Sequence, residues 1–179
     1  MDREAARMSD PVRRIVSVAA AAVALLAATT GPAHAQTGAP TPAAARAAGP
    51  MTAPTLMDEL VTLTNEERLR GGCAALETHQ ELMVVSVRQS HYMAATGDFG
   101  HIGWRGSTWQ ARSRAAGYTD AAAENIAWGF EDAGSVMDAW MASPPHRENI
   151  LNCATRSLGT GVQRAADGTL YWTQVFGYR

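Results

Sequence analysis

The pattern of apolar and polar positions predicts a block of helices followed by two strands. Leucines 56, 60 and 63 recur at helical spacing, which predicts a helix whose apolar face enters the core. Thr55 to Asp58 resembles a capping box and marks the predicted start of this helix. The helix is expected to end at Gly71-Gly72, because glycine commonly follows the last helical turn.

Three further helices and one turn follow from the same reasoning. Residues 80–96 carry apolar side chains on one face, and Gly97 ends that helix. A second capping box at residues 107–110 opens a short helix that ends near Gly117. Another helix begins at Ser135 and breaks at Pro144-Pro145, after which a single turn through His146 is expected.

The spacing of apolar residues changes from a helical to a strand-like pattern at the carboxyl end of the chain. Residues 158–165 and 169–177 are rich in Val, Thr and aromatic side chains and predict two strands. Asp167-Gly168 between them is a hairpin signal. Helices at the front and a sheet at the back favour an α+β fold over alternating βα units.

The first 55 residues differ from the rest in composition. Arg13 and Arg14 precede an apolar run, and Ala33-His34-Ala35 is typical of a signal-peptidase site, so residues 1–35 are predicted to be a signal peptide. The alternative is an uncleaved anchor, although the run is shorter than the roughly 20 residues of a spanning helix. Met8 is an alternative start. Residues 36–55 are predicted to be a flexible linker rich in Ala, Pro and Thr, and residues 56–179 to be the folded domain.

Charge and cysteine content narrow the class of protein. All 15 basic residues are arginines, the net charge is −2, and no basic run or zinc-finger spacing indicates a nucleic-acid partner. Cys73 and Cys153 are the two cysteines. In an exported protein this count favours a disulfide, and the alternative is that one of them is a catalytic thiol.

Three ionisable residues stand in short polar gaps between apolar elements: His101, Glu124 and His146. Glu124 lies within the apolar stretch AAAENIAWGF, where an unpaired charge would be costly. Two imidazoles and one carboxylate can bind a divalent metal, zinc in particular, with a fourth position open. The same groups without metal can form a structural hydrogen-bond network, and sequence spacing does not choose between the two.

Four strings carry a resemblance to a known family: FGHIG, GYTDAAAENIAWG, VMDAWMASPPHRENIL and LGTGVQRAADGTLYWTQVFG. In this order they resemble the bacterial branch of the CAP superfamily (cysteine-rich secretory proteins, antigen 5 and pathogenesis-related class 1 proteins), over essentially all of residues 56–179. The resemblance implies a three-layer α-β-α sandwich with a central antiparallel sheet, and a cleft with two histidines and two acids. His101, Glu124 and His146 match three members of that set. Residues 102–105 hold no carboxylate for the fourth, and Gly100 replaces the usual serine.

The resemblance implies a secreted binding module, at the cell wall or free outside the cell, and we expect a monomer without a membrane anchor after signal cleavage. Its partner would be a small molecule, lipid, glycan or protein. The alternative is a metal-dependent hydrolase with Glu124 as base, and a weaker one is a serine hydrolase built on Ser143 and His146. Four aromatic residues are candidate walls of an apolar groove or ordinary core residues: Trp104, Trp109, Trp128 and Phe130.

Overall fold

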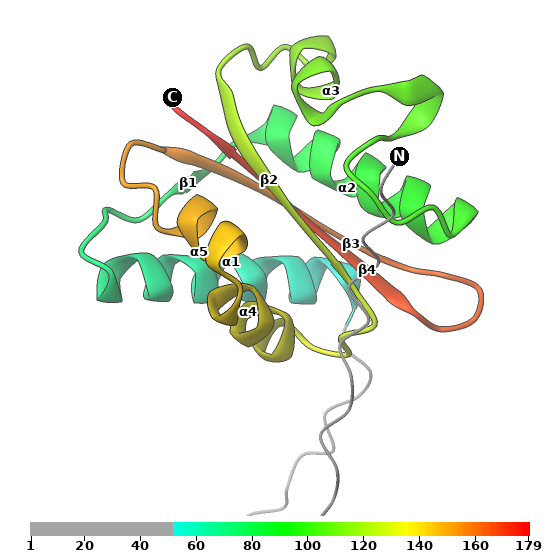
Figure 1. Ribbon diagram of the computed structural model, residues 1–179, viewed down its shortest axis with the longest axis horizontal. Helices are drawn as coiled ribbons and strands as arrows, with labels where there is room; N and C mark the ends of the chain where they lie inside the picture. The colour runs from blue at the N-terminus through cyan, green and yellow to red at the C-terminus, as the bar shows by residue number, and fades with distance from the viewer. Residues whose placement is uncertain (1–51) are drawn as a thin grey trace, which may run out of the picture. The chain divides into compact units, whose positions relative to one another are not determined.

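The computed structural model describes residues 52–179, and these residues form a three-layer α-β-α sandwich (Figure 1). The elements follow in the order α1 (Ala53–Arg70), β1 (Glu77–Thr78), α2 (Gln80–Thr96), η1 (Trp104–Gly106), α3 (Trp109–Ala115), β2 (Ala121–Trp128), α4 (Ala133–Ala142), α5 (Pro144–Ile150), β3 (Ser157–Arg164) and β4 (Leu170–Gly177). The predicted α+β sandwich is confirmed. The predicted signal peptide and nearly all of the predicted linker lie outside the described residues.

The sheet has the strand order β1-β3-β4-β2 and is mixed rather than purely antiparallel. β3 and β4 form the predicted hairpin, and β2 pairs antiparallel with β4. The exception is β1, two residues at the edge that pair parallel with β3, whereas β3, β4 and β2 form the expected central antiparallel sheet. The chain crosses over through α2 and later elements before it returns as β3, and such a crossover permits a parallel pair.

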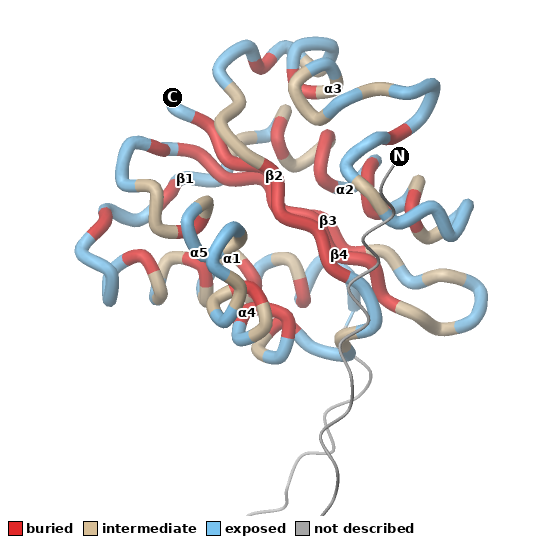
Figure 2. Tube along the Cα trace, viewed as in Figure 1, coloured by how far each residue is buried: buried red, intermediate tan, exposed pale blue. Residues whose placement is uncertain are grey.

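The two faces of the sheet bury different side chains, because successive residues of a strand point to opposite faces. Trp172 and Phe176 of β4 pack with α1 and α4 in the larger apolar cluster. Val175 packs with Leu82 and Val85 of α2 on the other face. The burial of the strands between these helical layers is visible in Figure 2.

Helix α2 approaches β3 very closely. A methyl group on Gly159 or Gly161 would overlap the backbone carbonyls of Leu82 or Ser86. The Ser86 hydroxyl instead donates to the Gly159 carbonyl over 3.0 Å. The two glycines of the LGTG sequence in β3 therefore permit the short distance between α2 and the sheet.

The first helix begins earlier than its sequence pattern predicts. Thr52 is the N-cap and accepts from the Thr55 amide, so Thr55 lies inside α1 instead of capping it. Pro54 at the start of the helix explains the difference, because proline suits the first turn, where its missing N–H has no helical partner. Among residues 52–179, no helix is both long and apolar enough to span a bilayer.

Candidate functional site

The candidate site lies along β2, an edge strand of the sheet. Glu124 pairs with Val175 and Asn125 pairs with Gln174 in the antiparallel register, so the two consecutive side chains point to opposite faces. Glu124 points to the face covered by α2 and α3, and Asn125 points toward α5. Side chains of α3 therefore contact β2 on one face of the sheet, and α5 contacts it on the other.

The Glu124 carboxylate is fully buried and both of its oxygens have partners. Arg112 Nη2 donates to Oε2 over 2.6 Å, and His101 Nδ1 lies 2.9 Å from Oε1. The side chain of Glu124 has 0 % exposure, that of Arg112 11 %, and that of His101 51 %. The buried carboxylate is therefore out of reach of a ligand. It orients the His101 imidazole, which is accessible to solvent.

Arg112 also holds the loop that carries His101. Its Nη1 donates to the backbone carbonyls of Ser107 and His101, at 2.7 and 3.2 Å. Gly103 lets this loop lie against the helices, because a side chain there would approach Gln89 Oε1 to 2.5 Å and Arg112 Nη1 to 2.9 Å. One guanidinium thus fixes the loop, the acid and, through the acid, the histidine ring.

His146 reaches the same edge from α5. Its Nδ1 lies 2.9 Å from Ser143 Oγ, and its backbone carbonyl accepts from Asn125 Nδ2 over 3.2 Å. Asn149 donates to Asn125 Oδ1, which fixes α5 against β2. Burial lowers the pKa of His146 below the usual imidazole value, and the charge of nearby His101 lowers that pKa further. Both effects favour the neutral form of the His146 imidazole.

The three site residues predicted from the sequence come together only in part. His101 and Glu124 are in direct contact. His146 makes no hydrogen bond to Glu124 or His101 in the described structure, and its link to His101 is electrostatic, since the charge of His101 lowers the pKa of His146. The site is better described as two imidazoles at one strand edge, one of them held by a buried acid.

These residues do not fit a divalent metal. Both oxygens of Glu124 are occupied, and Arg112 supplies the positive charge that a cation would bring. Within residues 52–179 no group of three or more His, Cys, Asp or Glu side chains is arranged to hold a metal ion. The zinc expectation therefore stays a prediction that the donor arrangement does not support.

The hydrolase alternatives also find no support in the geometry. Glu124 is tied to a guanidinium and is not free to act as a base toward water. Ser143 is near His146, but its hydroxyl contacts Nδ1 across three residues at the start of α5, as a local helix-start interaction. No acid contacts His146 among the described residues, so the third member of a triad is missing there.

Arg112 is the site residue that the sequence analysis missed. Arg147, which follows His146 in the sequence, is exposed and forms no ion pair among the described residues, so it is not the partner of Glu124. Arg112 is three residues after Trp109 and four before Ala116, on the partly buried face of α3. Helical periodicity combined with the need to pair a buried acid is the signal that could have identified it.

The four candidate aromatic residues divide between surface and core. Trp104 and Trp128 are exposed, whereas Trp109 and Phe130 are partly buried. Phe99, which precedes His101 by two residues, is also exposed, and its ring centroid lies 6.3 Å from that of Trp128. Exposed aromatic side chains therefore flank the accessible imidazole.

Comparison with known proteins agrees with this architecture. An uncharacterised membrane protein of Bacillus subtilis, YlbC, is 32 % identical over 120 residues, which are 66 % of this chain and 33 % of YlbC. The match thus spans about a third of that relative. An outer surface protein from Borrelia burgdorferi has a similar fold, with a TM-score of 0.63 at 23 % identity, covering 69 % of this chain and 92 % of that one.

A second solved structure is an extracellular protein of Bacillus anthracis that contains an SCP domain. It gives a TM-score of 0.63 at 27 % identity and covers 73 % of this chain and 45 % of that one. The sequence model of the cysteine-rich secretory protein family, CAP, matches residues 61–176. The four strings, the sandwich and this match agree, and the chain belongs to the CAP, or cysteine-rich secretory protein, family.

Proposed function

We propose that this CAP domain is an extracellular binding module whose ligand contacts the edge of β2. The observation that carries the proposal is the contrast between the buried Glu124 carboxylate and the half-exposed His101 ring that it orients. Here Nδ1 is bound to the acid, and the other ring nitrogen remains available to a ligand.

The apolar surroundings of His101 support the same reading. Phe99, Ile102 and Trp128 are exposed, and they lie in the loop that carries His101 or at the end of β2. Exposed apolar patches with polar groups among them are typical of binding surfaces. We refer to His101, His146, Phe99, Ile102 and Trp128 as the β2-edge surface.

Several features favour a location outside the cell. The predicted signal peptide ends at Ala35, Cys73 and Cys153 form a disulfide, and the related Bacillus anthracis protein is extracellular. The ligand would then be a small molecule, lipid, glycan or protein found outside the cell. Binding is a better account than hydrolysis, because neither Glu124 nor Ser143 is placed to act on a substrate.

The binding proposal is tested with the full chain on arrays of glycans and lipids and against secreted proteins. The informative variant is His101→Ala/His146→Ala, and the matched control is His91→Ala, which removes an exposed histidine from α2. A ligand of the β2-edge surface should bind the wild type and the control and lose at least about tenfold in affinity with the double variant. Equal binding by all three proteins would reject this surface as the site.

The location is tested separately. Expression of the full chain in a secreting bacterial host should give a mature protein in the medium that begins at Gln36, as read by mass spectrometry. A product that keeps residues 1–35 and stays with the membrane would support the anchor alternative.

A further inference from the structure

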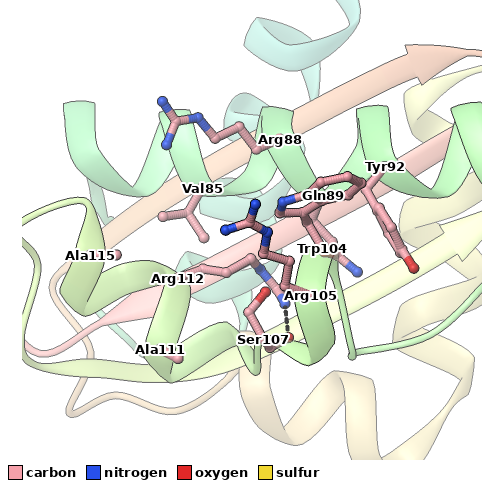
Figure 3. Close-up of a pocket in the computed structure, with 10 residues that line it drawn as sticks. All are labelled: Val85, Arg88, Gln89, Tyr92, Trp104, Arg105, Ser107, Ala111, Arg112 and Ala115. Atoms are coloured by element: carbon pink, nitrogen blue, oxygen red, sulfur yellow. Dashed lines mark hydrogen bonds between the residues drawn. The ribbon is translucent and has the colours of Figure 1, made fainter.

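A pocket of about 420 Å³ lies between α2, η1 and α3, beside the β2-edge surface and without His101 or His146 in its lining (Figure 3). This volume is within the roughly 300–1,000 Å³ of typical small-molecule sites. Its ten lining residues are Val85, Arg88, Gln89, Tyr92, Trp104, Arg105, Ser107, Ala111, Arg112 and Ala115. We call it the arginine pocket.

The charged side chains of the arginine pocket are all arginines, with no acid among the lining residues. Arg112 is neutralised by Glu124, but Arg88 and Arg105 form no ion pair within residues 52–179. Residues 56–179 contain ten arginines and fourteen acids, and none of these acids pairs with Arg88 or Arg105 in the described structure. Two uncompensated guanidinium groups at one hollow favour an anion, and their planar geometry suits a carboxylate.

The uncharged residues that line the arginine pocket favour a ligand whose remaining part, apart from the anionic group, is apolar. Val85, Ala111 and Ala115 contribute small aliphatic surfaces from the two helices. Trp104 is 68 % exposed, and the Arg105 guanidinium carbon lies 5.8 Å from the centre of its ring. Flat indole and guanidinium groups provide surfaces against which another flat group can stack.

The backbone at Arg105 is held in an unusual conformation. With φ at 56°, Arg105 is the one non-glycine residue between 52 and 179 that has a positive φ. The turn is closed by Gly103 N donating to Ser107 O over 2.8 Å and by Gly106 N donating to Gly103 O over 3.0 Å. A left-handed conformation at a residue other than glycine costs stability, and such costs cluster where a side chain is presented for a function.

From these observations we propose that the arginine pocket binds a small, flat, apolar molecule that carries a carboxylate. The carboxylate pairs with Arg105 and Arg88, and the flat body packs between Trp104 and the small side chains of α2 and α3. This second site does not rest on the proposed function of the β2-edge surface.

The probe is 2-naphthoate, and the uncharged 2-naphthamide of the same shape is its control. Both are titrated into the full chain and followed by NMR at the Trp104 indole N–H, which is identified by its absence from Trp104→Phe. We expect saturable shifts with naphthoate and an affinity roughly tenfold lower for the amide, since the charge-assisted bonds are lost.

Substitutions separate the charge of Arg105 from its backbone. Arg105→Asn keeps a residue that tolerates a positive φ and should fold normally, yet it should lose most of the preference for naphthoate over naphthamide. Arg105→Lys should keep a reduced preference, because a point charge replaces a planar fork. Arg114→Ala is the matched control, since Arg114 is an exposed arginine of α3 outside the pocket lining.

Equal affinity for the acid and the amide, or a wild-type preference in Arg105→Asn, would overturn the proposal. An equal loss in Arg114→Ala would also overturn it, because the effect would then be one of overall charge. None of these results bears on the β2-edge surface, which is tested with its own histidine variants.

Discussion

Arg112 donates to the fully buried carboxylate of Glu124 over 2.6 Å, so the acid in the edge strand β2 is part of an ion pair. The same guanidinium binds the carbonyls of His101 and Ser107. The stretch AAAENIAW can therefore enter the core with its charge, because helix α3 supplies the opposite charge at hydrogen-bonding distance.

Arg112→Ala should be strongly destabilising, because it leaves the Glu124 charge buried and the His101 loop untied. We expect a loss of about 3–5 kcal/mol in the free energy of unfolding, measured by urea denaturation. Adding Glu124→Gln should recover part of this loss, which a double-mutant cycle would quantify. Arg114→Ala, on the exposed side of the same helix, should stay within about 0.5 kcal/mol of the wild type. A similarly small effect of Arg112→Ala would mean that the buried ion pair is absent in solution.

Gly159→Ala should be among the most damaging single-methyl additions. The new methyl group would overlap the Leu82 carbonyl, which belongs to the helix backbone and cannot rotate away. We expect about 3 kcal/mol or more of destabilisation in the same denaturation experiment. Gly100→Ala is the control, since the nearest atom to its added methyl group is 4.0 Å away. If both variants were equally stable, α2 and β3 would be further apart than the structure places them.

Much of this fold follows from local pattern. Helix α2 has the predicted bounds because its apolar positions recur regularly and Gly97 adopts the left-handed conformation that ends it. The β3–β4 hairpin was predicted because Val, Thr and aromatic residues flank Asp167-Gly168.

Strand β2 was not predicted because its sequence lacks the local features of a strand. It begins with three alanines, which have little preference for strands, and its buried residues 124–127 are consecutive. Pairing with β4 decides its conformation, and that pairing is between distant parts of the chain. Glu124 and His101 could be placed together through the family resemblance, but the choice of Arg112 among ten arginines of the domain depends on how α3 packs.

The disulfide between Cys73 and Cys153 is confirmed, and its loss should lower stability without abolishing the fold. The two cysteines are 80 residues apart, so the chain-entropy model gives an upper figure of about 4–5 kcal/mol. Arg68 already links the same regions, because its buried guanidinium donates to the carbonyls of Ala74, Ile150 and Asn152. We therefore expect Cys73→Ser/Cys153→Ser to keep the near-UV circular dichroism of the wild type at a lower melting temperature. A variant without near-UV signal in the cold would show that the arginine links are insufficient.

Zinc should not bind the wild-type domain stoichiometrically, because both oxygens of Glu124 already have hydrogen-bond partners and the positive charge of Arg112 lies beside the carboxylate. Calorimetric titration of the chelator-treated protein at mildly alkaline pH should show no saturable heat. The control is a titration of His101→Ala/His146→Ala, which should be indistinguishable from the wild type. Tight binding at one equivalent that is lost in this variant would instead support the metal expectation and require rearrangement of the Arg112–Glu124 pair.

His146 should contribute to acid sensitivity. Its pKa is lowered in the folded state, first by burial and then by the charge of His101, while the unfolded chain has an ordinary imidazole. The unfolded state therefore binds a proton more readily, so the stability present above the unfolded pKa near 6.5 is lost as pH falls toward the folded value. His146→Gln removes this proton uptake and should lose less melting temperature than the wild type between about pH 7 and pH 5. His91→Gln, an exposed control on α2, should follow the wild-type curve, and identical curves for all three proteins would show that His146 is not held neutral by the fold.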